Sequence, residues 1–183
     1  MDQAARARLR QGAQTLALLF FLFSAAGWLW EMLFVGAATG RLVNRGVLHG
    51  PWLPVYGTGG VLIVLLLGRC RGWRLLLRSA LVGGAVEYAA SVALERLFHA
   101  RWWDYSGWPW NLNGRVALGS AAAFALAGWL AVRLAGPALA GLLARLPDRA
   151  RTAACRCLGL LFVLDAAASL IRPNMGEGIS ILL

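Results

Sequence analysis

The chain has 183 residues, of which 60% are hydrophobic and 14% charged, with a mean hydropathy of +0.64. So few polar side chains cannot cover the surface of a water-soluble domain of this size, and the composition excludes that class. All 18 basic residues are arginine and the formal net charge is +10. Because the arginines fall in short clusters between apolar runs, we expect membrane lipids with anionic headgroups as partners, and no nucleic acid.

The apolar runs predict an all-α bundle of five transmembrane helices that forms a single transmembrane domain over residues 1–183. Met1 to Gln14 is polar, and the run that follows lacks a clear cleavage site, so it is interpreted as a retained first helix. A bilayer core requires roughly 20 apolar residues, and each run is near that length, although the second is short and the least secure. The predicted helices cover residues 15–38, 52–68, 75–98, 116–136 and 153–171.

The arginines also predict an orientation. If the helices alternate in direction, twice as many arginines fall on the side of the N-terminus as on the other side, so the positive-inside rule places the N-terminus in the cytoplasm. The loops Thr39 to Pro51 and His99 to Arg115 are then extracytoplasmic. The cytoplasmic set is Arg6, Arg8, Arg10, Arg69, Arg71, Arg74, Arg78, Arg133, Arg145, Arg149, Arg151 and Arg156, and the other set is Arg41, Arg45, Arg96, Arg101, Arg115 and Arg172.

The cysteines and the phosphate-binding motifs bear on cofactors. Cys70, Cys155 and Cys157 lie in arginine-rich segments on the predicted cytoplasmic side, where disulfides are rare. They could together hold a metal, but no fourth ligand is evident, so we predict no metal site and no cofactor. The G-x-x-x-x-G-K-[ST] motif of nucleotide-binding loops does not occur.

Three carboxylates lie inside apolar helices: Glu31 in the first, Glu87 in the third and Asp165 in the fifth. A charged side chain at the centre of a membrane helix costs several kcal/mol, so such residues usually face a bundle interior or a wet cavity. Each is a functional candidate, although pairing with arginine to stabilise the bundle is the structural alternative. Asp165 is the weaker candidate because no motif surrounds it.

Helical spacing places small and polar residues beside the first two acids. We expect these two helix faces to pack together around a polar centre, because small residues allow close approach. The faces consist of Ser24, Gly27 and Glu31 on the first helix, and of Gly83, Glu87, Ser91 and Glu95 on the third.

The first loop, Asn44 to Gly60, is rich in glycine and proline, which suits irregular backbone that lines a cavity. Asn44 and Arg45 supply its polar groups. His49 could exchange a proton near neutral pH, but a histidine without a partner motif is more often a hydrogen-bonding bystander.

The second loop, His99 to Arg115, contains four tryptophans, which an interfacial aromatic belt would explain. The belt does not explain its polar residues. Asp104 invites an arginine partner, and Asn111 or Asn113 could cap the fourth helix. Arg115 would then lie in that helix's first turn, where the helix dipole disfavours a cation, so we expect it to face an acid or an anionic ligand.

With these motifs in view, the chain resembles a bacterial family of multi-pass inner-membrane proteins named as ABC-transporter permeases of the CmpB type. The resemblance spans about Phe20 to Pro137, and the segment from about Ala138 onward lies outside it. It departs at two positions, with His49 where an aromatic residue is expected and Leu53 where cysteine is common. The motifs are Gly27-Trp28 with Glu31, Asn44-Arg45-Gly46 through Gly50-Pro51, Pro54-Val55-Tyr56-Gly57, Glu87-Tyr88 with Ser91 and Glu95, and Arg101-Trp102-Trp103-Asp104-Tyr105-Ser106 through Asn111-Leu112-Asn113-Gly114-Arg115.

The resemblance implies transport, with a separate ATPase or another membrane protein as partner. Our leading hypothesis is an outward-facing polar pocket that binds, and translocates, a small polar or anionic solute. Two other classes stay open: a membrane-embedded enzyme acting on a lipid headgroup, which lacks a convincing nucleophile or metal cluster, and a non-catalytic assembly subunit. The predicted solute-binding residues are Glu31, Asn44, Arg45, Glu87, Asp104, Asn113 and Arg115.

Overall fold

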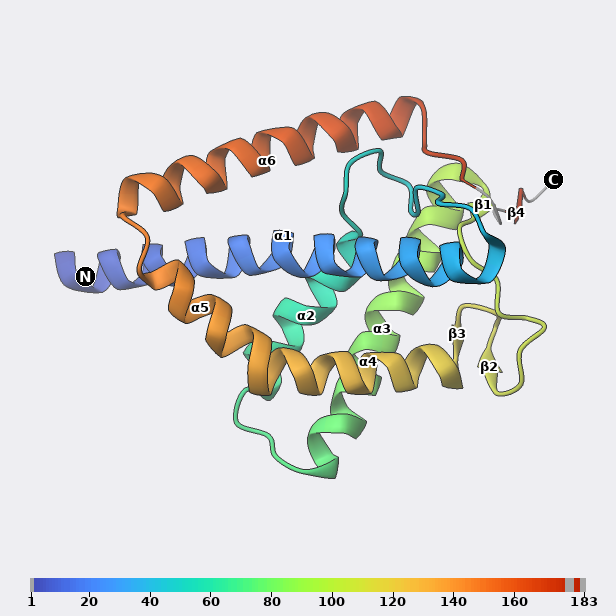
Figure 1. Ribbon diagram of the computed structural model, residues 1–183, viewed down its shortest axis with the longest axis horizontal. Helices are drawn as coiled ribbons and strands as arrows, with labels where there is room; N and C mark the ends of the chain where they lie inside the picture. The colour runs from blue at the N-terminus through green and yellow to red at the C-terminus, as the bar shows by residue number, and fades with distance from the viewer. Residues whose placement is uncertain (1, 177–179, 182–183) are drawn as a thin grey trace.

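Five helical segments account for most of the chain in the computed structural model, which describes residues 2–176 and 180–181. Their order is α1 (Gln3–Thr39), α2 (Pro54–Leu67), α3 (Trp73–Phe98), a long helix at Leu118–Ala144, and α6 (Asp148–Ile171) (Figure 1). The four helices other than α2 are long and apolar enough to cross a membrane. The predicted all-α membrane architecture is confirmed.

The first two helices differ in extent from the sequence-based boundaries. The polar segment before Thr15 is also helical, since alanine, arginine, leucine and glutamine all favour helix. α2 begins with Pro54 in its first turn, where the missing N–H costs nothing. With 14 residues it is about 21 Å long, shorter than the ~30 Å bilayer core.

The long helix from Leu118 to Ala144 has an irregular middle. It consists of α4 (Leu118–Leu130), a π-helical turn η1 (Ala131–Ala135) and α5 (Gly136–Ala144), and Gly136 donates its N–H to the carbonyl of Ala131, five residues back. Pro137 lacks an N–H and its ring crowds the preceding turn, so the wider turn lets the helix continue past it. The helix therefore extends well beyond the predicted end near Gly136.

The predicted direct packing of the first helix face on the third is wrong. α2 lies between α1 and α3 and packs on both, while α3 packs mainly on α4. A Cβ at Gly57 would collide with Ser24, and one at Gly128 would collide with Ser79. Glycine is needed at both positions because the helix axes approach so closely.

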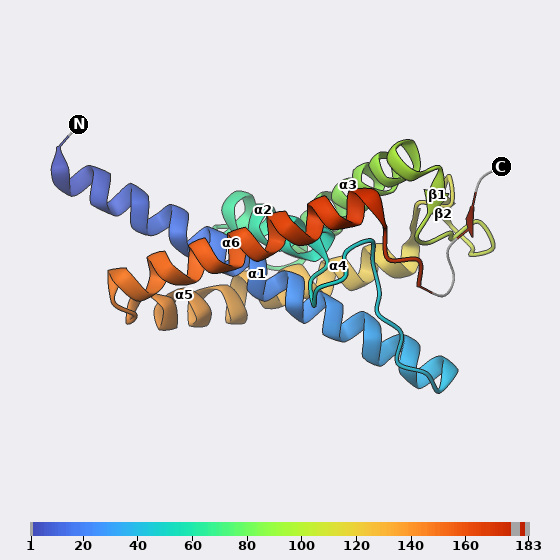
Figure 2. The ribbon, with the colours of Figure 1, turned by 90° about the horizontal axis from the view of Figure 1, so that it is seen from above.

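The apolar core lies toward the C-terminal end of α2. There Ile63, Leu67, Leu75 and Val132 form a buried cluster of α2, α3 and η1 residues. Among the long helices, α6 packs mainly on α1, and Figure 1 shows it on the side of α1 opposite α4. Figure 2 shows the N-terminal turns of α1 extending beyond the other helices.

Short strands order the second loop. β2 (Asn111–Leu112) pairs antiparallel with β3 (Val116–Ala117), and β1 (Ala100–Arg101) pairs with β4 (Ser180–Ile181). The β2–β3 turn has positive φ at Asn113 (55°) and Gly114 (69°), as a type I′ hairpin turn requires. The expected asparagine cap on the fourth helix is therefore wrong. The residue before α4, Ala117, instead donates its N–H to Ser120 Oγ at 3.0 Å.

Candidate functional site

A cavity of about 70 Å³ lies where both loops meet α1, α2, α3 and α4. By the usual measure this is room for a few water molecules or one very small solute. Its charged lining residues are Glu31, Arg45 and Glu87, so three of the seven predicted residues share one site. The rest of the lining is Gly46, Leu53, Val55, Tyr56, Trp102, Trp103, Tyr105 and Phe124.

Glu31 is held by one hydroxyl and one guanidinium. Tyr56 donates its hydroxyl to Glu31 Oε1 at 2.6 Å, and Arg45 Nε lies 3.8 Å from Oε2. The Tyr56 ring can reach this position because Gly27 has no side chain, and a Cβ there would overlap the ring. The α1 face that contains Gly27 and Glu31 thus packs on Tyr56 of α2 and not on α3.

Glu87 is more buried, with only 6% of its surface exposed. Tyr105 donates its hydroxyl to Glu87 Oε1 at 3.2 Å, and Ser120 Oγ lies 2.8 Å from Oε2. Within residues 2–176, no arginine or histidine forms an ion pair with this carboxylate. Ser120 has a single proton and also lies 3.0 Å from the carbonyl of Ala117, so Glu87 is only weakly satisfied.

Tyr105 belongs to the second loop and closes the cavity over Glu87. Burial raises the pKa of its phenol well above the ordinary range, and the nearby charges of Glu87 and Glu31 raise it further. The hydroxyl therefore stays protonated and acts as a donor. The loop thus supplies a neutral hydrogen bond to an acid that no cation of the described residues neutralises.

Arg115 lies beside the cavity, among polar groups of α3. Its guanidinium is 2.8 Å from Glu95 Oε2 and donates to Ser91 Oγ at 2.9 Å, and it stacks over the Tyr88 ring at 5.7 Å from the centroid. Its side chain is 12% exposed. As expected, Arg115 faces an acid, but it follows the β2–β3 turn and is not in the first turn of α4.

Arg101 shares the same acid. Its Nε lies 2.7 Å from Glu95 Oε2, and this hydrogen bond is the main reason that the pKa of Arg101 is raised. Two guanidiniums thus converge on one carboxylate, which ties the second loop to the end of α3. The network is well satisfied and contributes no residue to the cavity lining.

Asp104 and Asn113 shape the second loop without lining the cavity. Asp104 Oδ1 accepts hydrogen bonds from the Ser106 hydroxyl at 2.6 Å and the Ser106 N–H at 2.9 Å, and lies 4.0 Å from Arg101. The hydrogen bonds from Ser106, and then the charge of Arg101, lower the pKa of Asp104. Asn113 donates to Tyr88 Oη at 3.0 Å from its turn position.

Asn44 connects the first loop to α1 through a side-chain hydrogen bond. Its Oδ1 accepts the Trp28 indole N–H at 2.6 Å, and its Nδ2 donates to the carbonyl of His49 at 2.9 Å. Asn174, beyond α6, donates to the carbonyls of Asn44 and Gly46 and accepts the indole N–H of Trp102. The segment after α6 therefore joins the two loops beside the cavity.

Asp165 is not at the cavity but fixes the first loop to α6. Its carboxylate accepts the backbone N–H groups of His49 at 3.0 Å and Gly50 at 2.9 Å, and the Trp52 indole N–H at 2.7 Å. Ser169 Oγ lies 3.3 Å away. Four donors thus surround the carboxylate, and this environment indicates a structural role for Asp165.

His49, Ser169 and Asp165 do not form a nucleophile relay. Ser169 Oγ and Asp165 Oδ1 approach the same ring nitrogen of His49, Nδ1, at 3.1 and 3.5 Å. A relay needs the hydroxyl and the carboxylate on opposite nitrogens of the imidazole. The described residues also contain no group of three or more histidine, cysteine or acidic side chains that could hold a metal.

Sequence analysis missed the hydroxyl groups at this cavity. Tyr56 and Tyr105 lie within the family motifs but carry no charge, and Ser120 lies in an alanine-rich helix. A buried acid without an arginine needs donors of another kind. That requirement could have predicted that the motif tyrosines, Tyr56 and Tyr105, donate hydrogen bonds to the two carboxylates.

The apolar helices and the acidic cavity between them define a helical membrane protein. The comparisons identify its family: residues 18–170 match the model of the CmpB family, described as "Putative ABC-transporter type IV", and the chain belongs to that family. The match also covers most of α6, so the expectation that the resemblance ends near Ala138 is wrong. No curated protein and no solved structure matches the chain.

Proposed function

We propose that this chain binds a small polar solute, neutral or cationic, in the cavity between Glu31 and Glu87, as one step in moving it across the membrane. The observation that carries the proposal is the pair of carboxylates that line the cavity with, among the described residues, a single guanidinium beside them. Glu87 would supply the negative charge for the solute. Tyr56 and Tyr105 would orient the two acids.

The charges argue against an anion in this cavity. Arg45 faces Glu31, and Arg115 is engaged by Glu95 and Ser91 outside the lining. With both acids ionised the lining carries one net negative charge, and charge interactions are strengthened away from water. A polar solute therefore fits the geometry better than the anionic solute that the sequence also allowed.

The family supports ATP-driven transport, and we propose that a separate ATPase supplies it. On the orientation predicted from the arginines, the cavity lies toward the extracytoplasmic side of a bacterial inner membrane. The Arg69 to Arg74 connection and the α5–α6 connection would then face the cytoplasm. These connections are the candidate contact surface for the ATPase.

Binding can be tested with the purified full chain in detergent. We expect ammonium and methylammonium to raise the unfolding midpoint of the wild type, and formate and phosphate to leave it unchanged. Glu87→Gln should abolish the shift. Glu95→Gln is the matched control, because this acid is on the same helix face but outside the cavity lining, and its variant should retain the shift. Stabilisation by anions, or an unchanged shift in Glu87→Gln, would refute the proposal.

Affinity capture of the full chain from membranes, followed by mass spectrometry, tests the partner. A stoichiometric ATPase supports the transport proposal. An unrelated membrane protein in stoichiometric amount would point instead to an assembly subunit. A co-purified lipid that is chemically altered on incubation would point to an enzyme.

A further inference from the structure

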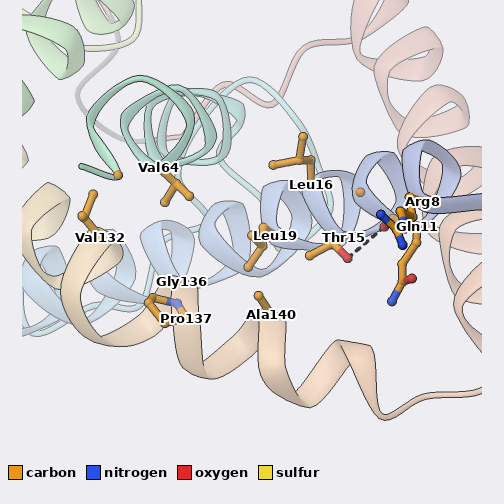
Figure 3. A pocket seen from close by; sticks show the side chains of 12 residues that line it. Arg8, Gln11, Thr15, Leu16, Leu19, Val64, Val132, Gly136, Pro137 and Ala140 are labelled. Atoms are coloured by element: carbon orange, nitrogen blue, oxygen red, sulfur yellow. Dashed lines mark hydrogen bonds between the residues drawn. The ribbon is translucent and has the colours of Figure 1, made fainter. Parts of the chain in front are cut away.

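A larger groove lies far from the acidic cavity, between the N-terminal half of α1, the C-terminal end of α2 and the η1–α5 part of the long helix. Its volume is about 610 Å³, within the range of roughly 300–1,000 Å³ typical of ligand pockets. None of its lining residues lines the acidic cavity. Figure 3 shows Val64 and Val132 at one end and Arg8 and Gln11 at the other. The lining consists of Arg8, Gln11, Gly12, Thr15, Leu16, Leu19, Val64, Gly68, Val132, Gly136, Pro137 and Ala140.

The groove is polar at one end only. Leu16, Leu19 and Val64 belong to its apolar walls, whereas the exposed Arg8 and Gln11 lie at the other end. Thr15 has its hydroxyl bonded to the carbonyl of Gln11 at 2.9 Å and so adds little polarity to the interior. A fitting occupant has a long apolar part and an anionic group at one end.

Arg8 is available for such a group. Within the described part of the chain it forms no hydrogen bond or ion pair, whereas the neighbouring Arg10 donates to Thr152 Oγ1 at 2.9 Å. The first turn of α1 also contains no acidic residue. The guanidinium of Arg8 is thus a positive charge at the mouth of an apolar groove, complementary to a phosphate.

The spacing along α1 places Arg8 near the level of the lipid headgroups. Arg8 precedes Thr15, where the apolar run begins, by about 10 Å along the helix. The polar zone on each side of a bilayer core is roughly 5–8 Å thick, so Arg8 lies close to the outer edge of that zone. On the predicted orientation this is the cytoplasmic leaflet, whose anionic lipids attract basic residues.

We propose that this groove binds an anionic phospholipid, with an acyl chain along Leu16, Leu19 and Val64 and the phosphate on Arg8. The lipid would fill the space between α1 and the η1–α5 segment and so stabilise the packing around Pro137. The site is independent of the acidic cavity and does not rest on solute transport.

Native mass spectrometry of the full chain, titrated with phosphatidylglycerol and with phosphatidylcholine, tests the proposal. We expect the wild type to prefer phosphatidylglycerol. Arg8→Gln should weaken phosphatidylglycerol binding about fivefold, the effect of one arginine at a charged lipid surface, and remove the preference. Arg6→Gln is the matched control, because Arg6 is on the same segment but outside the lining, and it should retain the preference.

A second pair of variants tests the groove itself. A Cβ at Gly12 or at Gly141 would meet no atom within 4 Å, so a side chain can leave the backbone at both positions without a clash at its first atom. Gly12 lines the groove and Gly141 does not. Gly12→Leu should lower binding of both lipids, and Gly141→Leu should change neither.

Three outcomes would overturn the proposal. These are equal binding of the two lipids by the wild type, equal effects of Arg8→Gln and Arg6→Gln, and unchanged lipid binding in Gly12→Leu. Loss of a dimer in Gly12→Leu, with lipid binding intact, would assign the groove to a second copy of the chain instead.

Discussion

Asp165 and Glu87 are both acids within apolar helices, yet their surroundings differ. The Asp165 carboxylate accepts two backbone N–H groups and one indole N–H, and Ser169 lies near it. Among the described residues, Glu87 meets only two hydroxyls, and it borders a cavity. An acid in a membrane helix is thus structural where its acceptor capacity is filled, and a candidate for binding where it is not. The number and kind of hydrogen-bond donors around an acid thus distinguish a structural acid from a binding candidate. The free-energy cost of burying the charge does not distinguish them, because both acids pay it.

Asp165→Ala should have the largest effect on stability. It removes the acceptor of three N–H donors of the first loop, of which the Trp52 indole belongs to a buried side chain whereas the exposed His49 N–H can turn to water. A buried donor left without an acceptor costs about 1–3 kcal/mol, so we expect a destabilisation of about 2–3 kcal/mol. The unfolding midpoint in detergent measures it. Methylammonium binding per folded molecule should persist, because Asp165 is outside the cavity.

A double-mutant cycle checks the mechanism of that loss. Trp52→Phe removes the indole N–H that Asp165 accepts at 2.7 Å. If the carboxylate acts through the loop donors, Trp52→Phe should cost less in the Asp165→Ala background than in the wild type. Strict additivity would show that Asp165 stabilises the fold in another way.

Glu87→Gln should show the reverse pattern. The amide keeps the shape of the side chain, and the Tyr105 and Ser120 hydroxyls can rotate to suit it, so stability should change by less than about 1 kcal/mol. Methylammonium affinity should fall at least about tenfold, since a hydrogen bond to a charged group contributes about 1.5–3 kcal/mol. Isothermal titration measures it. Severe unfolding of this variant would place Glu87 in the same structural class as Asp165.

Arg115→Gln should have a smaller effect, on stability alone. It removes charged hydrogen bonds to Glu95 and Ser91, but Arg101 still binds Glu95, so we expect a loss of about 1 kcal/mol. The midpoint of unfolding and the methylammonium titration should be measured together. A loss of binding without a loss of stability would return Arg115 to the solute site.

Asp104 should give the smallest effect, seen only in acid. Its pKa is lower in the folded state than in the unfolded chain, so its contribution is complete above the unfolded pKa of about 4 and is lost as the pH falls through the folded pKa. Tryptophan fluorescence of the second loop, followed from pH 6 to pH 2, should differ between the wild type and Asp104→Asn in that window. Identical titrations would mean that Asp104 does not order the loop.

The helices and their class could be predicted because apolar runs near 20 residues have few alternatives in a bilayer. The predicted third helix, 75–98, differs from α3 only at its start. The fourth helix was placed less well. Its true start depends on the Asn113-Gly114 hairpin, and its continuation past Pro137 depends on a π-helical turn.

The sequence by itself determined a membrane-embedded helical protein and singled out Glu31 and Glu87, because charged groups in apolar helices are costly and therefore conspicuous. It singled out Arg45 as a polar residue in a loop rich in glycine and proline. Only the tertiary structure decided how they are used. It placed α2 between α1 and α3 and paired Arg115 with Glu95. It also joined Asp165 to the first loop by hydrogen bonds and placed Tyr105 over Glu87. Pairing between side chains so far apart in the chain depends on the direction of each helix and loop in space, which local composition and periodicity do not encode.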